Sequence, residues 1–184
     1  MDFLSKLKQL EEQKRLVSAF EKTLSENGAK ISQSKSLADV SFYHSLAIET
    51  AKSAVFFEGN ASTSNTNLRQ FIRPEGEHVV ITALEVLAGN NATLGSTDWT
   101  PLTTGDAYAK NATMTVYANG IKVLDRYPLA DFIKDVDSDE PATVELMTPI
   151  FWGGQTELRV EYSSTVGGAA SDNLRIGVKG IGLI

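Results

Sequence analysis

The stretch ATMTVYANGIKVLDRY, residues 112–127, decides the fold class. Apolar and polar side chains alternate on both sides of Asn119-Gly120, which is the pattern of two half-buried strands. Asparagine and glycine both tolerate the positive φ angles of a two-residue type I′ turn, so this pair is a strong hairpin signal. We therefore predict an antiparallel hairpin built from residues 112–118 and 121–127.

Further short β-rich runs lie on both sides of this hairpin, separated by turn-forming clusters, which is typical of a sandwich or barrel. Residues 89–110 form a long polar connection, and residues 129–136 fit a short helix. Residues 40–49 fit a strand or a helix, and we favour the strand. Eight strands predict a single jelly roll, an eight-stranded antiparallel β-sandwich, preceded by an N-terminal amphipathic α-helix. The eight runs are residues 54–57, 68–72, 78–87, 112–118, 121–127, 143–147, 157–162 and 174–183.

The N-terminal region, residues 2–27, has the spacing of one amphipathic helix. Asp2 in the first turn and Gly28 after the last suit the helix dipole and a left-handed cap. Lys14 and Glu21 interrupt the seam that a coiled coil needs, so the helix is expected to lie on a protein surface. We divide the chain into a helical arm and hinge, residues 1–35, and a jelly-roll domain, residues 36–184. The apolar stripe of the arm is Phe3, Leu4, Leu7, Leu10, Val17, Phe20 and Leu24.

Charge and composition narrow the function. The 184 residues include 17 basic and 23 acidic side chains, which gives a formal charge of −6. A negative charge disfavours contact with phosphates, so we expect no specific binding of nucleic acid. Residues 1–35 hold seven basic and five acidic residues, a net of +2, which leaves −8 for residues 36–184. The chain has no cysteine, so disulfides, thiolate zinc sites and cysteine nucleophiles are excluded.

No motif indicates catalysis. His44 and His78 do not have metal-ligand spacing, so we assign both to structural roles. The chain has neither a nucleophile-elbow pattern nor a phosphate-binding glycine loop, and we predict no enzyme activity and no cofactor. One acidic run has alternating carboxylates and is either a solvated connection, which we favour, or a weak divalent-cation site. This run is Asp135, Asp137, Asp139 and Glu140.

Two further patterns each have two interpretations. Trp99 and Trp152 lie beside turn residues, where a tryptophan either stacks on a sugar ring or, more commonly, packs at the end of a core or in a subunit contact. Asn60, Asn91 and Asn111 begin Asn-X-Ser/Thr triplets, which are glycosylation acceptors in secreted proteins but also arise by chance. We favour the structural and the chance interpretation, respectively.

Residues 53–89, SAVFFEGNASTSNTNLRQFIRPEGEHVVITALEVLAG, resemble a segment of bacteriophage virion proteins with jelly-roll folds. The matching features are an aromatic pair, a Thr-Asn-Leu, a Pro-X-Gly turn and a strand. They stand here at Phe56-Phe57, Thr66-Asn67-Leu68, Pro74-Glu75-Gly76 and residues 79–86. Pro149-Ile150, Gly153, residues 157–162 and residues 174–184 are similar to the last two strands of phage capsid sandwiches. The resemblance covers about 130 residues.

The resemblance implies a non-enzymatic virion structural protein that acts through self-assembly. A single roll of this length implies a coat subunit of a tailless icosahedral phage, a spike or penton component, or an accessory head protein. The expected partners of the arm are further copies and other virion proteins, and contact with a viral membrane is the less favoured option. The alternative function is a carbohydrate-binding or adhesin module, because the same sandwich also presents loops to sugars.

Overall fold

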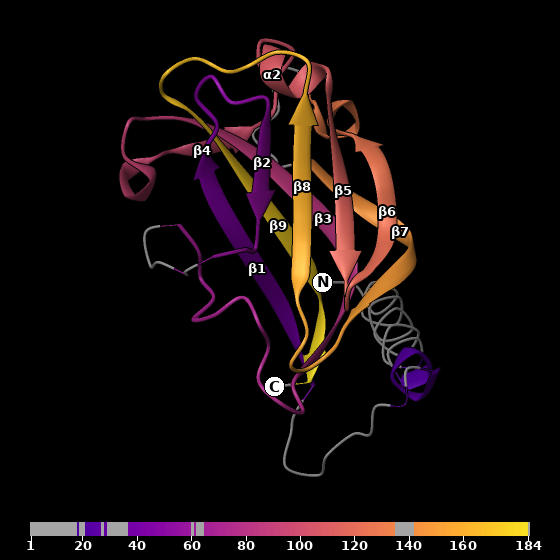
Figure 1. Ribbon diagram of the computed structural model, residues 1–184. Helices are drawn as coiled ribbons and strands as arrows, with labels where there is room; N and C mark the ends of the chain where they lie inside the picture. Colours follow the sequence, from indigo (N-terminus) through magenta and orange to yellow (C-terminus); the bar gives the residue numbers. More distant parts are fainter. Residues whose placement is uncertain are drawn as a thin grey trace, which may run out of the picture.

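The computed structural model describes residues 18, 21–26, 28, 37–59, 61, 65–134 and 142–183. Within them, nine strands form two antiparallel sheets that face each other (Figure 1). One sheet has the order β1-β9-β3-β4, with β7 also paired to β3, and the other has the order β2-β8-β5-β6. The strands are β1 (Leu37–Ala47), β2 (Ser53–Phe56), β3 (His78–Asn90), β4 (Trp99–Pro101), β5 (Ala112–Ala118), β6 (Ile121–Pro128), β7 (Ala142–Trp152), β8 (Leu158–Ser164) and β9 (Asp172–Leu183).

The strand pairs are nested around the hairpin of residues 112–127. Innermost, β5 pairs with β6; then β3 pairs with β7, β2 with β8, and β1 with β9. One long antiparallel ribbon is thus folded across two sheets, which is the topology of a jelly roll. The predicted fold class is confirmed, and β4 is a short addition at the end of β3.

The turn of the central hairpin has the predicted geometry. Asn119 and Gly120 have φ angles of 55° and 75°, which a type I′ turn requires. The Asn119 side chain also makes two hydrogen bonds to the backbone at the end of β7. Its Nδ2 donates to the carbonyl of Phe151 at 2.9 Å, and its Oδ1 accepts from the amide of Gly153 at 3.0 Å. The hairpin tip is therefore fastened to the end of β7.

The core lies between the two sheets. Strand β5 alternates buried and half-buried residues. Its Met114 and Val116 are fully buried in the main apolar cluster, as is Trp152 of β7. A bulge at Thr82 interrupts the register of β3 with β9. Opposite it, a Cβ on Gly180 would overlap the carbonyl oxygen of Val80, so this close approach of two backbones requires glycine.

The structure corrects the predicted boundaries. Residues 68–72 form no strand, and only Ile72 makes an isolated bridge, to Glu157. Leu68 and Phe71 are apolar because they are buried in the core, although this segment is not paired as a strand. The strand favoured at residues 40–49 is confirmed as β1. With β1 in place of residues 68–72, the jelly roll has its eight strands.

The long connection predicted over residues 89–110 is only partly irregular. Strand β3 extends to Asn90, and the connection holds a 3₁₀ turn η1 (Leu94–Ser96), β4 and one turn of helix, α2 (Ala107–Lys110). The helix predicted at residues 129–136 is a single 3₁₀ turn, η2 (Leu129–Phe132). Its buried Leu129 and Phe132 pack into the core, and the chain returns to extended backbone at Ile133.

The described part of the N-terminal region, Ser18 and residues 21–26, is helical. Leu24 is 1% exposed and packs against Val80, Ile181 and Leu183. Because the neighbouring residues of β3 point into the main core, this contact lies on the outer face of the β1-β9-β3 sheet. No helix in the described residues is both long enough and apolar enough to cross a bilayer.

Candidate functional site

Strands β6 and β7 lie on the same side of the sandwich (Figure 1), and both carry exposed apolar side chains. Ile121 is 67% exposed, Val123 is 42% exposed and Met147 is fully exposed. Strand β5 buries every second residue, whereas no described residue of its partner β6 is fully buried. We call the β6 and β7 margin with these three residues the open edge.

Bulges explain why the open edge is exposed. Tyr117 pairs with Lys122 and Val116 with Leu124, which leaves Val123 as an extra residue in β6. In β7, residues 146–149 stand opposite a single residue of β3. Such irregular strands bend away from their sheet and offer a poor template for further strand pairing. The open edge therefore exposes side chains more than backbone.

An apolar groove of about 540 Å³ runs along the open edge. Ile121 and Val123 form one wall, and residues 149–151 of β7 form another. Lys22 and Glu26 of the helical segment stand at its rim and form an ion pair of 3.8 Å with each other. The groove thus combines an apolar lining with a charged margin, which is the composition of a protein-docking surface.

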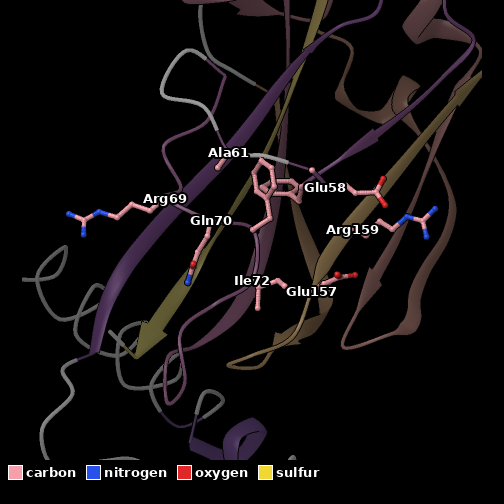
Figure 2. Close-up of a pocket in the computed structure, with 10 residues that line it drawn as sticks. Glu58, Ala61, Arg69, Gln70, Ile72, Glu157 and Arg159 are labelled. Atoms are coloured by element: carbon pink, nitrogen blue, oxygen red, sulfur yellow. The ribbon is translucent and has the colours of Figure 1, made fainter.

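A second cavity, the cleft, has a volume of about 490 Å³ and lies between the segments around residues 57–61 and 69–72 and the start of β8. Figure 2 shows Arg69 extending to one side of the cleft, and Glu58 and Arg159 on the other. Arg159 is held by Glu161, with Nη2 and Oε1 2.6 Å apart. The cleft is lined by equal numbers of acidic and basic side chains, so it suits a neutral polar ligand better than an ion. The charged lining residues are Glu58, Arg69, Glu157 and Arg159.

His44 lies behind the cleft in the core. Its Nδ1 accepts a hydrogen bond of 2.7 Å from the amide of Phe57, a residue with φ of 62°, so the ring proton is on Nε2. The rings of Phe56, Phe57 and Phe71 surround the imidazole, and Nε2 has no partner among the described residues. Burial lowers the pKa of His44 to about 4, so the side chain is neutral at pH 7.

The opposite margin of the same sandwich is covered. Asn67 Oδ1 accepts from the amide of Tyr43 at 2.9 Å, and Asn67 Nδ2 donates to the carbonyl of Ser41 at 2.8 Å. Thr66 Oγ1 donates to the carbonyl of Tyr43 at 2.5 Å. Thr66 and Asn67 therefore take the place of a neighbouring strand along β1. We call this margin the closed edge.

Both tryptophans and both histidines make structural contacts. Trp152 is fully buried, which excludes a sugar-stacking role, and its Nε1 donates to the carbonyl of Thr156 at 3.0 Å. Trp99 is half-buried and packs 4.1 Å from the guanidinium of Arg175. His78 accepts a hydrogen bond from the amide of Gly154 and stacks on Phe151. The contacts of His44 and His78 are those that the structural interpretation expects.

Several predicted site residues fall outside the described residues. Of the arm stripe, the structure places only Leu24, on the body of its own chain. Within the described residues, no group of three or more histidine, aspartate or glutamate side chains is positioned to hold a metal ion. Asn91 is half-buried and Asn111 is exposed. The predicted residues that lie outside are Phe3, Leu4, Leu7, Leu10, Val17, Phe20, Asn60, Asp135, Asp137, Asp139 and Glu140.

Comparison with known proteins adds little to this geometry. No protein-family model matches the chain, and no curated protein matches it. A solved structure that is similar in part is the cryo-EM structure of the extra small virus VLP of the giant freshwater prawn Macrobrachium rosenbergii. The identity is 11%, the similarity covers 79% of each chain, and the TM-score is 0.28. Because this TM-score is low, the fold assignment rests on the strand pairing alone.

Proposed function

We propose that this chain is a non-enzymatic structural subunit that acts through self-assembly as a capsid or capsid-associated protein of a virion. The open edge carries the proposal, because a rigid jelly-roll body there exposes Ile121, Val123 and Met147 beside an apolar groove. Clustered exposed apolar residues of this kind mark interaction surfaces. The finer setting, a bacteriophage particle, is supported by the resemblance of residues 53–89.

The energetics suit assembly from many copies. Burial of one such side chain contributes about 1.5–3 kcal/mol, so the three residues supply a gross term of roughly 5–9 kcal/mol before the cost of association. A single contact of that size is weak. A closed particle in which each subunit makes several such contacts is stable, and the expected partners are further copies and other virion proteins.

The experiment is to determine the assembly state of the purified full chain by sedimentation velocity over a range of concentrations, with electron micrographs of the same samples. We expect rings, shells or other closed assemblies that grow with concentration. A monomer that persists at the highest concentration would overturn the proposal.

The alternative, a carbohydrate-binding or adhesin module, is favoured by one observation, the cleft of Figure 2. Its balanced Glu and Arg side chains could hydrogen-bond a neutral sugar. This alternative predicts a small oligomer and a glycan that binds the full chain. Replacement of Arg159 by alanine should then abolish glycan binding, whereas the structural subunit would assemble as before.

A further inference from the structure

We propose that the apolar groove at the open edge is the docking site for the N-terminal apolar stripe of a second copy of this chain. The docking residues of that second copy are Phe3, Leu4, Leu7 and Leu10. This inference rests on the proposed function, since it names the surface through which copies assemble. Three observations lead to it.

The first observation is that the groove is not filled by the helical segment of its own chain. Successive residues of an α-helix are rotated by about 100°, so Leu24 points away from both Lys22 and Glu26. Leu24 is buried against Val80 and Ile181, whereas Lys22 and Glu26 stand at the rim of the groove. The segment therefore turns its charged side to the groove and leaves Ile121 exposed.

The second observation is the position at which the remaining N-terminal residues join the described structure. Within the described helical segment, Lys22, Thr23 and Glu26 line the groove. Residues 3–10 precede Leu24 by 14 to 21 positions, and a helix of that length spans about 21–32 Å. Leu24 occupies the outer face of its own sheet, and a helix of the predicted length is long enough for residues 3–10 to contact a second copy.

The third observation is charge. Residues 1–35 carry a net charge of +2 and residues 36–184 carry −8. Two bodies repel each other, whereas the arm of one copy and the body of another attract. An exchange of arms between copies is therefore the contact that their electrostatics favour.

The absence of cysteine allows a clean test by engineered disulfides. One copy carries Leu7→Cys, and a second copy with a size tag carries Val123→Cys; the two are mixed, assembled and oxidised. We expect up to about half of the protein to run as the mixed dimer on a non-reducing gel, because in an equimolar mixture only every second Leu7→Cys arm meets a Val123→Cys body. The matched control is Val166→Cys, because Val166 is 40% exposed against 42% for Val123 but follows β8 at the other end of the sandwich (Figure 1).

Three crosslinking results would overturn the inference. One is assembly of both variants without the Leu7–Val123 crosslink, which leaves the proposed function intact. Another is an equal crosslink to Val166→Cys, which would show that the contact is not specific. The third is a crosslink formed within one chain that carries both Leu7→Cys and Val123→Cys. Leu10→Cys replaces Leu7→Cys if the first variant melts at a lower temperature, and a chain that stays monomeric overturns this inference together with the proposed function.

Discussion

The two margins of the sandwich differ in what they expose to solvent. At the closed edge, Thr66 and Asn67 hydrogen-bond to the backbone of β1, so that part of its hydrogen-bonding potential is already used. At the open edge, bulges disturb β6 and β7, and Ile121 and Met147 face outward. Unpaired strand edges invite aggregation, and proteins manage them with bulges or with covering groups. Here polar side chains cover the closed edge. At the open edge, bulges interrupt the regular backbone, and apolar side chains are exposed instead.

The two edges differ in how selectively they can bind another chain. A backbone edge pairs with many extended segments, because its hydrogen bonds do not depend on side chains. An apolar groove with a charged rim accepts only a surface of matching shape and charge. On the proposed function, the jelly roll avoids unspecific strand pairing at both margins, and the open edge is its selective surface.

The largest expected effect comes from breaking the open edge. The double variant Ile121→Asp with Val123→Asp should abolish assembly, because docking of an apolar surface would have to bury two carboxylates in place of two apolar side chains. Both side chains are exposed, so the melting temperature of the body should not fall. Sedimentation velocity measures assembly, and a thermal melt monitored by circular dichroism measures the fold.

The matched control for this variant is Val166→Asp. Val166 has nearly the same exposure as Val123 but lies outside the groove, so assembly should persist. If the double variant assembled like the unmodified chain, the open edge would not be the recognition surface.

Acid should destabilise the whole fold through His44, the buried histidine of β1. Burial lowers the pKa of His44 to about 4 from 6.5, so the unfolded chain binds a proton before the folded chain does. The contribution of neutral His44 is therefore present above pH 6.5 and is lost as the pH falls toward 4. The loss is about 3 kcal/mol in the free energy of unfolding, measured by urea titrations between pH 7 and pH 4.

The substitution that isolates this effect is His44→Asn. Asparagine retains an acceptor near the position of Nδ1 for the amide of Phe57 but does not titrate. Its stability should be lower at pH 7 but nearly flat across the same pH range. The other histidine provides the control, since His78→Asn should keep most of the pH dependence. A steep dependence in His44→Asn would assign the acid sensitivity to another group.

A smaller effect is expected from uncovering β1. Asn67→Ala removes two hydrogen bonds to the backbone of Ser41 and Tyr43 and should lower the free energy of unfolding by about 2 kcal/mol. Asn67→Asp retains the acceptor for Tyr43 and loses the donor to Ser41, so it should cost about half as much. Urea titrations at pH 7 give both values. Equal losses in the two variants would mean that the donor to Ser41 carries the whole effect.

The two edges also differ in how far the sequence predicts them. The hairpin of β5 and β6 follows from alternation and from Asn119-Gly120, because both signals are local. The nested pairing of β1 with β9 joins residues far apart in the chain, and only the general rhythm of strands and turns indicates it. The jelly roll was therefore predictable as a class, but its strand partners were not.

The candidate site was largely hidden in the sequence. Val123 alternates with polar neighbours as a half-buried strand residue does, and nothing local shows that a bulge leaves it exposed. Residues 68–72 were misread as a strand for the converse reason, since Leu68 and Phe71 are buried without strand pairing. Thr66-Asn67 stood out only through a resemblance, and its role as an edge cover needs the position of β1.

The smallest effect concerns the turn that holds β6 at the open edge. Gly120 has a φ of 75°, and no atom lies within 4 Å of the position that a Cβ would take. Gly120→Val should therefore cost only the backbone strain of a β-branched residue at positive φ, about 1 kcal/mol, without any clash. Gly120→Asn is the matched control, because asparagine adopts this conformation with little strain, and it should melt close to the unmodified chain. The melting temperature of Gly120→Val should fall by roughly 2–4 °C for a chain of this size. Asn119 still fastens the hairpin to Phe151 and Gly153 in both variants, so assembly should survive. If Gly120→Val lost assembly while it melted like Gly120→Asn, the angle of β6 at the open edge would matter more for recognition than for the fold.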